Sequence, residues 1–169
     1  LGFRNLTTYI ARSLLETGGF RPLLHPQMRW AVKASDEDLR WLYPGRTPDE
    51  SLAAWLDLGP ALVALTRGAD GPVILTRQGR VEMPAEPVTV ADTVGAGDSF
   101  IAALVSGLGQ LGALGGDRRT RLHRLSPGEL QALAAYANRA AAITCSRPGA
   151  NPPTTAELGS LAGMPAGAG

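Results

Sequence analysis

The sequence has few of the residues that disulfide-bonded, metal-binding or membrane-spanning proteins use. Cys145 is the only cysteine, so the chain can form neither an intramolecular disulfide nor a cysteine-based zinc site. The two histidines, His25 and His123, lie far apart, which argues against a histidine-rich metal site. No apolar run approaches the ~18–20 residues that cross a bilayer. The chain starts at Leu1 without Met or a signal-peptide pattern, so its numbering is expected to begin inside a longer chain.

The sequence also has a single lysine and a net charge close to zero. The formal net charge of +1 gives no electrostatic reason to expect nucleic acid or an anionic membrane as a partner. Lys33 is the only lysine among 16 Lys and Arg residues, and no glycine run precedes it, so a Walker phosphate loop is absent. Hydrophobic residues make up 44% of the 169 residues, which is enough for the core of one domain.

Short apolar segments alternate with helical patterns along the chain. The run at 61–65 is continuously apolar, as in a strand that is buried on both faces, and Gln78-Gly79 predicts a hairpin turn. The predicted strands cover residues 30–34, 61–65, 73–76, 80–83 and 88–90. The predicted helices cover 6–16, a short segment capped by Ser35, 47–58, 98–108, 129–144 and 154–161. This order predicts an α/β layered fold with a largely parallel sheet.

The segment 92–100, Asp-Thr-Val-Gly-Ala-Gly-Asp-Ser-Phe, follows a predicted strand and opens a helix. Gly95 and Gly97 permit a tight turn and leave the backbone N–H groups uncovered. Together with the helix N-terminus, these N–H groups favour an anion site. Asp98 lies in the first helical turn. It is either a simple helix cap or a general base that takes a proton from a hydroxyl nucleophile.

The run 92–104 resembles the C-terminal signature of the PfkB (ribokinase-like) carbohydrate kinase family, and the chain is most similar to the fructokinase branch. The resemblance implies a ribokinase-like three-layer α/β/α sandwich, incomplete because only the C-terminal half of the family pattern is present. Members of the family phosphorylate sugars or nucleosides with ATP and Mg²⁺. By this resemblance Asp98 is the catalytic base, and the N–H groups of Gly95, Ala96 and Gly97 stabilise charge on the γ-phosphate.

Two further segments resemble the nucleotide site of this family. The segment 66–71 matches a strand-end nucleotide loop, although an ordinary turn explains it equally well. Asn138 occupies the position of a nucleotide-contacting asparagine, and a helix-surface amide is the alternative. The candidate contacts in the loop are Thr66, Gly68, Asp70 and Gly71.

Two sets of oxygen ligands follow from the same resemblance. Ser35, Glu37 and Asp38 stand where many members have Asn-x-x-Glu. Ser35 would contact the nucleotide, and Asp38 and Glu37 would hold Mg²⁺ through water, although a helix N-cap with an acidic first turn explains the same residues. The loop 142–151 resembles one that closes the adenine pocket and, in many relatives, supplies carbonyl oxygens to K⁺. The implied K⁺ ligands are the backbone carbonyls of Asp92, Val94, Thr144, Arg147 and Gly149, with Pro153 where some relatives offer a serine hydroxyl.

The resemblance divides the chain into three parts. Residues 1–30 match the family poorly, 31–162 form a nucleotide-binding and catalytic half, and 163–169 form a glycine-rich tail that is expected to be disordered. The basic segment 117–124 favours a solvated loop between helices over a phosphate or nucleic-acid site. Cys145 is expected to be a small core residue.

The expected function is ATP-dependent phosphorylation of a sugar hydroxyl by a truncated form of a carbohydrate kinase. Fructose is the leading substrate, and 2-keto-3-deoxygluconate, ribose or a nucleoside are alternatives. A catalytically silent nucleotide-binding or subunit-interaction fragment is the competing hypothesis from another class. The expected cofactors are ATP and Mg²⁺, with K⁺ as a further candidate. The expected partners are ATP and a small sugar, without nucleic acid or membrane, in a cytoplasmic protein that forms a homodimer if full length.

Overall fold

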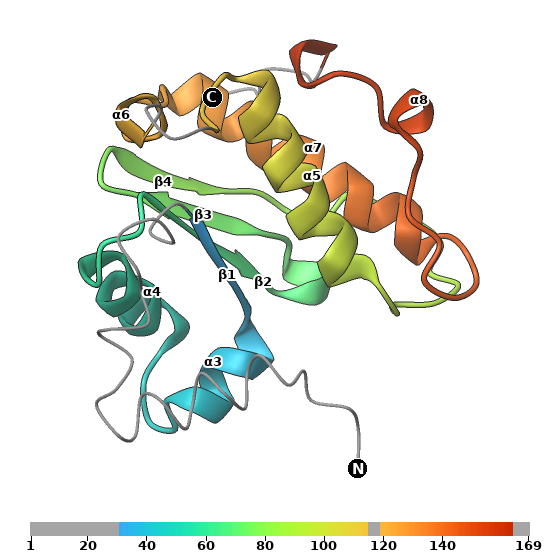
Figure 1. Ribbon diagram of the computed structural model, residues 1–169. Coiled ribbons are helices and arrows are strands. Elements are labelled where there is room, and N and C mark those ends of the chain that lie inside the picture. Colours follow the sequence, from blue (N-terminus) through green and yellow to red (C-terminus); the bar gives the residue numbers. More distant parts are fainter. Residues whose placement is uncertain (1–30, 115–118, 164–169) are drawn as a thin grey trace.

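The computed structural model describes residues 31–114 and 119–163 (Figure 1). The expectations for residues 1–30, including a helix over 6–16, lie outside the described residues. The same holds for the tail after Gly163 and for Asp117 and Arg118 of the basic segment.

The centre of the fold is a four-stranded sheet in the order β1-β2-β3-β4. β1 (Ala31–Ser35) and β2 (Leu62–Thr66) run parallel, whereas β3 (Val73–Thr76) and β4 (Gly79–Glu82) each run antiparallel to the strand before them. The prediction of a largely parallel sheet is therefore wrong. The links between β2 and β3 and between β3 and β4 are too short for the crossover that a parallel pair requires, so these strands form a meander.

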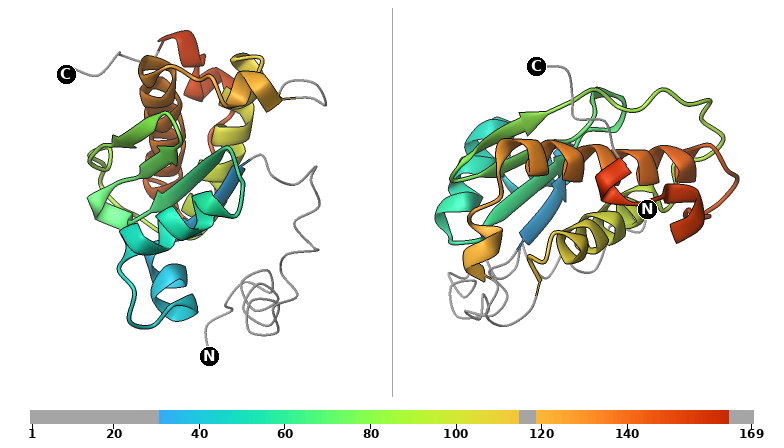
Figure 2. Two further views of the ribbon diagram at one scale, coloured as in Figure 1. Left: turned by 90° about the vertical axis from the view of Figure 1, so that its left-hand side faces the viewer. Right: turned by 90° about the horizontal axis from the view of Figure 1, so that it is seen from above.

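Helices cover both faces of this sheet. α3 (Asp36–Leu42) and α4 (Pro48–Asp57) lie on one face, and α5 (Ala96–Gln110) and α7 (Pro127–Cys145) lie on the other (Figures 1 and 2). Alternate residues of β2 enter different cores: Leu62 and Ala64 pack with α5 and α7, and Val63 and Leu65 pack with α3 and α4. All four are at most 1% exposed, so β2 is buried on both faces, as its apolar run predicts. The three-layer α/β/α arrangement is confirmed.

Side-chain caps determine where most of the helices begin. α3, α4, α7 and α8 (Thr155–Leu158) each start with a Ser or Thr that accepts the backbone N–H three residues later, while the acidic side chain there accepts the N–H of the cap. The cap predicted at Ser35 is confirmed, and Thr47, at the start of the helix predicted over 47–58, caps α4. α5 differs because Gly95 is its N-cap and provides no side chain. The remaining short helices are η2 (Gly68–Asp70), α6 (Arg119–Leu122) and η3 (Leu161–Gly163).

Three predicted elements differ from the structure. Val88–Val90 is not a strand: Pro84 and Pro87 lack the N–H groups that a ladder needs, and Val90 is 59% exposed. The basic segment 117–124, predicted to be a loop, contains α6. The helix predicted over 154–161 is divided into α8 and η3 at Gly159, whose φ of +78° ends α8. Within the described ranges, none of the helices has the length and apolar character that spanning a membrane requires.

The two long helices approach each other at a glycine. Gly107, in the middle of α5, is buried, and a Cβ added there would lie 2.6 Å from Leu133 Cδ1 and 2.9 Å from Leu161 Cδ1. Leu133 and Leu161 are themselves buried, so they have little space to move. Gly107 therefore permits the close packing of α5 on α7 that holds the start of α5 in place.

We expect Gly107→Ala to lower the free energy of unfolding by about 1–3 kcal/mol, because the methyl group overpacks the contact with Leu133 and Leu161. Gly109→Ala is the matched control: in the same helix its Cβ would lie 3.6 Å from the nearest atom, Leu114 Cδ1, an ordinary contact. This control should gain up to about 1 kcal/mol through the lower entropy of the unfolded chain. Urea unfolding of both variants measures the difference, and equal stabilities would contradict the prediction.

Candidate active site

The glycine loop leads directly into α5. Gly95 adopts a left-handed conformation with φ of +78°, and its carbonyl accepts the N–H of Ser99 at 2.9 Å, so the helix starts at Ala96. No side chain caps this end, which leaves the first N–H groups of α5 without a side-chain acceptor. Aligned peptide dipoles give this end of a 15-residue helix a partial positive charge. The predicted anion-binding residues Gly95, Ala96 and Gly97 therefore occupy the N-cap and the first two helical positions.

Asp98 is exposed in the first turn of α5, whereas the next two residues are buried: Ser99 is 6% and Phe100 is 1% exposed. Phe100 belongs to the core shared with α7 and anchors this turn. The carboxylate is thus held at a fixed helical position and presented to solvent. It does not cap α5, since no side chain forms a capping hydrogen bond there.

Asp92 joins the glycine loop to the loop that follows α7. Its Oδ1 accepts the N–H of Val94 and its Oδ2 accepts the N–H of Gly149, each at 3.0 Å. The N–H groups of Ala91 and Asp92 donate to the carbonyl of Cys145 at 2.8 and 3.2 Å. The hydrogen bonds from Val94 and then Gly149 favour the charged carboxylate and hold the pKa of Asp92 below its usual value. Four of the predicted K⁺ ligands, Asp92, Val94, Arg147 and Gly149, therefore come from two loops that touch, and the fifth, Thr144, lies in the last turn of α7.

Backbone N–H groups already occupy part of this carbonyl set. The Thr144 carbonyl accepts the N–H of Arg147 at 3.2 Å, and the Gly149 carbonyl accepts the N–H of Asn151 at 2.9 Å. Because a carbonyl oxygen has two lone pairs, each can accept one further contact. The donor set is hard oxygen and thus fits an alkali cation. Arg147 itself is held by Glu157, whose carboxylate lies 2.5 Å from the guanidinium.

Cys145 is half-buried at the end of α7 rather than a full member of the core, because the helix ends there and its carbonyl faces the Asp92 loop. Burial and then the charge of Asp92 raise the pKa of its thiol. The prediction that it is a small core residue is therefore only partly met, and the thiol is protonated at neutral pH.

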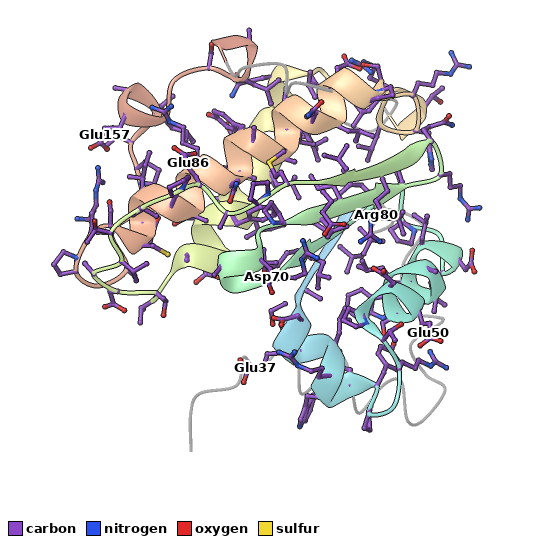
Figure 3. All side chains as sticks on the ribbon, turned by 180° about the vertical axis from the view of Figure 1, so that it is seen from behind. Glu37, Glu50, Asp70, Arg80, Glu86 and Glu157 are labelled. Carbon is purple, nitrogen blue, oxygen red and sulfur yellow. The ribbon has the colours of Figure 1, made fainter. Side chains whose placement is uncertain are left out.

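Ser35 and Asp38 form the capping box of α3. The Ser35 N–H donates to Asp38 Oδ2 and the Asp38 N–H donates to Ser35 Oγ, both at 3.1 Å. The helix-cap explanation of these residues is therefore confirmed. Glu37 projects outward from α3, exposed (Figure 3). Among residues 31–114 and 119–163, no group of three or more His, Cys, Asp or Glu side chains could hold a metal ion. Mg²⁺ does not require such a group, since it commonly keeps its waters and binds through one or two carboxylates and substrate phosphates.

The loop after β2 starts beside the cap of α3, because Thr66 pairs with Ser35 in the parallel register. Thr66 Oγ1 donates to the carbonyl of Ala34 at 3.4 Å. Arg67 keeps the loop compact by donating to the Asp70 and Gly71 carbonyls, each at 3.1 Å. Figure 3 places Asp70 at this end of the sheet.

Two of the candidate nucleotide residues have structural contacts as well. A Cβ at Gly71 would lie 2.1 Å from the carbonyl oxygen of Met83, so this position requires glycine for packing alone. Asn138 Nδ2 donates to the Pro84 carbonyl at 2.9 Å and fastens the segment after β4 to α7. The same side chain therefore fixes the path that leads to the glycine loop.

Lys33 is the charged residue of this site that the sequence analysis did not select. Residues of β1 alternate between the two faces of the sheet. Ala34 packs on the face covered by α3 and α4, whereas Ala31 packs on the face covered by α5. Lys33, two residues after Ala31, lies on the same face as Ala31. Its Nζ lies only 3.0 Å from where a Gly97 Cβ would be. Burial lowers the pKa of Lys33, and the charges of Asp38 and Asp98 oppose that shift. One feature of the sequence could have pointed to Lys33: it is the only lysine of the chain, and it lies on a strand that leads toward the glycine loop.

The basic segment has a structural contact at Arg121, which forms an ion pair with Glu129 in the first turn of α7. The side chains of Arg121 and Glu129 are both about one-third exposed, at 35% and 30%. This pair links α6 to α7, as expected for a segment that connects helices.

The pfkB family carbohydrate kinase model matches residues 10–157. The chain belongs to this family. The match begins at residue 10, so it includes part of the segment 1–30, for which the sequence predicts a poor match. As a pfkB family member, the chain has its glycine loop, Asp98 and the Asp92 contact inside the matched region.

Relatives and solved structures agree with this assignment. A fructokinase from Rhizobium leguminosarum bv. trifolii is 47% identical over 77 residues, which are 46% of this chain and 24% of that protein. A double-mutant fructokinase from Vibrio cholerae O395, solved with fructose, ADP and potassium ion, is 26% identical with a TM-score of 0.58, covering 78% of this chain and 38% of that one. Aminoimidazole riboside kinase from Salmonella enterica, at 24% identity and a TM-score of 0.61 over 86% of this chain and 45% of that one, shares the fold. The chain thus matches less than half of the length of each.

We expect Asp92→Asn to destabilise the protein at neutral pH. The charged carboxylate accepts hydrogen bonds from the N–H groups of both Val94 and Gly149, and a neutral amide cannot replace both of these bonds. A carboxylate whose pKa is lowered on folding stabilises the folded state above its unfolded pKa, near 3.8, and this effect is lost as pH falls through the folded value. The stability difference between wild type and Asp92→Asn should therefore hold at neutral pH and shrink below about pH 4. Denaturant unfolding at several pH values measures it, with Glu86→Gln as an exposed charge-loss control. A difference that does not change with pH would contradict the prediction.

We expect Gly95→Ala to cost more stability than Gly149→Ala. Both glycines have positive φ, +78° and +67°, so both substitutions carry the left-handed penalty of ~1–2 kcal/mol. Only at Gly95 would the new Cβ also lie 2.9 Å from Ala150 Cβ, while Gly149 has open space. Thermal unfolding of the two variants isolates that contact, and equal losses would show that the two loops do not press together.

Proposed function

We propose that this chain provides the ATP-binding and catalytic part of a carbohydrate kinase that transfers the γ-phosphoryl group of ATP to a sugar hydroxyl. The observation that carries this proposal is the pairing of an uncapped helix start at Gly95 with the exposed carboxylate of Asp98 one turn later. Fructose is the leading substrate, since the Vibrio cholerae relative is a fructokinase solved with fructose. Ribose, a nucleoside or 2-keto-3-deoxygluconate would use the same chemistry.

In the proposed reaction, Asp98 accepts the proton of the sugar hydroxyl as its oxygen attacks the γ-phosphorus. The bond between the γ-phosphorus and the bridging oxygen breaks, and ADP leaves with the bonding electrons. Charge on the transferred phosphoryl group is stabilised by the N–H groups of Gly95, Ala96 and Gly97, which the helix already orients. Positioning and electrostatics thus supply most of the catalysis.

Further residues are proposed to hold the nucleotide and the cations. Mg²⁺ would neutralise phosphate charge, held through water by Asp38 and Glu37. K⁺ would bind the backbone carbonyls of the two loops that Asp92 joins and would help to fix the glycine loop. The residues proposed to contact the nucleotide are Ser35, Thr66, Gly68, Asp70, Gly71 and Asn138, and the K⁺ carbonyls are those of Asp92, Val94, Thr144, Arg147 and Gly149.

A second candidate function is nucleotide binding or subunit interaction without turnover. It is supported by the limited coverage of the relatives, since the match to the Rhizobium fructokinase spans 24% of that protein. We also propose a cytoplasmic location, where ATP is available and a single free cysteine stays reduced, and a homodimer for the full-length protein.

We expect Asp98→Asn to reduce sugar-dependent ADP release by about 10²–10⁴-fold, because the amide cannot accept the hydroxyl proton. Nucleotide affinity should remain within about twofold, since Asp98 acts on the sugar hydroxyl. The assay uses the 169-residue chain with Mg-ATP, K⁺ and fructose. Asp57→Asn is the control, because it removes an exposed carboxylate from α4 on the opposite face of the sheet.

The possible results separate the two candidate functions. Turnover that persists in Asp98→Asn would refute the general-base role. A wild-type chain that binds ATP but phosphorylates none of the four candidate sugar classes would favour the silent nucleotide-binding fragment.

A further inference from the structure

Lys33 brings a second positive charge to a place that is already positive. Its side chain leaves β1 on the face covered by α5, and its ammonium lies against Gly97 in the first turn of that helix. The N-terminal end of α5 carries the positive pole of the helix dipole and has no side-chain cap. A cation near this pole is unfavourable unless negative charge lies between them.

Among residues 31–114 and 119–163, the protein supplies only part of that negative charge. Asp38 and Asp98 are the two carboxylates whose charges act on Lys33, and burial outweighs both of them. Asp38 is also held by its capping bond with Ser35, and Asp98 is exposed to solvent. The ammonium is therefore partly desolvated and incompletely neutralised, next to backbone N–H groups that have no side-chain acceptor.

We propose that Lys33 is a further catalytic residue, which binds the phosphoryl group in transit between ATP and the sugar. This inference rests on the proposed function and adds to it a side-chain cation that neither the glycine loop nor the cation sites supply. The ammonium and the α5 N–H groups would hold the γ-phosphate from two sides, with Asp98 beside it to receive the hydroxyl proton. Lysine suits this task as a compact charge on a flexible stem.

Nucleotide binding by charge variants provides the first test. Lys33→Met keeps the length of the side chain and removes the charge, and because it places an apolar group in a half-buried site it should fold. We expect the affinity for an imido-bridged ATP analogue with Mg²⁺ to fall about ten- to hundredfold, as loss of a charged hydrogen bond implies. ADP affinity should stay within about twofold, because ADP lacks the γ-phosphate. Lys33→Arg should restore part of the loss, and Arg40→Met, an exposed cation on α3, should change neither affinity.

Chemical labelling gives a second and independent readout, because Lys33 is the only lysine of the chain. In an ATP derivative with an acyl group on the γ-phosphate, a nearby ε-nitrogen attacks the acyl carbon. The acyl–oxygen bond breaks, ATP leaves, and the nitrogen loses its proton to solvent. Mass spectrometry should find Lys33 acylated by this probe, protected by excess ATP, and unlabelled by acetyl phosphate at the same concentration.

The outcomes distinguish this inference from the proposed function. Selective loss of triphosphate affinity together with nucleotide-directed acylation supports the role of Lys33. If wild type binds the ATP analogue but Lys33→Met weakens ADP and the analogue equally, or Lys33 is not acylated, the role of Lys33 is wrong and the kinase proposal stands. If wild type binds neither nucleotide, both proposals fail.

Discussion

The packing of α5 against α7 and β2 determines where the glycine loop can be. Phe100, Leu104 and Leu108 lie one turn apart on the buried face of α5 and are each at most 1% exposed. Gly107 lets α7 approach this face closely. With the helix axis held in this way, its first turn must lie over the end of β1, where the side chain of Lys33 meets Gly97. The groups proposed to act on phosphate therefore depend on apolar contacts up to about three helical turns away from them.

Asp92 connects this helix start to the rest of the candidate site. One carboxylate accepts an N–H from each of two loops that are distant in sequence, and its lowered pKa keeps it charged at neutral pH. The carbonyls proposed to bind K⁺ lie on the same two loops, except that of Thr144 in the last turn of α7. A cation there and the Asp92 hydrogen bonds would have the same mechanical effect, which is to hold Gly95 against Ala150. The contact between Gly95 and Ala150 is thus needed both for the stability of the two loops and for the proposed function.

Several side chains proposed for function also have structural roles. Ser35 and Asp38 cap α3, Gly71 makes space for Met83, and Asn138 holds the segment after β4. These contacts do not conflict with binding of nucleotide or Mg²⁺, since a carboxylate has about four lone-pair sites and an amide oxygen keeps two. Because of these contacts, a substitution at one of these residues could lower activity by destabilising the fold, so stability must be measured together with activity. Asp98 and Lys33 are better probes, because neither one caps a helix.

The sequence by itself determined the elements whose signals are local. The apolar run of β2, the caps of α3 and α4 and the glycine loop before α5 depend on residues close together in the chain. So does the β3–β4 hairpin, whose turn is Arg77-Gln78, one residue before the predicted Gln78-Gly79. Only the tertiary structure decided what depends on distant residues. The antiparallel meander follows from how β2, β3 and β4 pair, and the segment 88–90 pairs with neither edge strand of that sheet, β1 or β4. The role proposed for Lys33 arises in the same way: in sequence it is one lysine on a strand, and packing alone brings its side chain to Gly97 at the N-terminal end of α5, about 64 residues further along the chain.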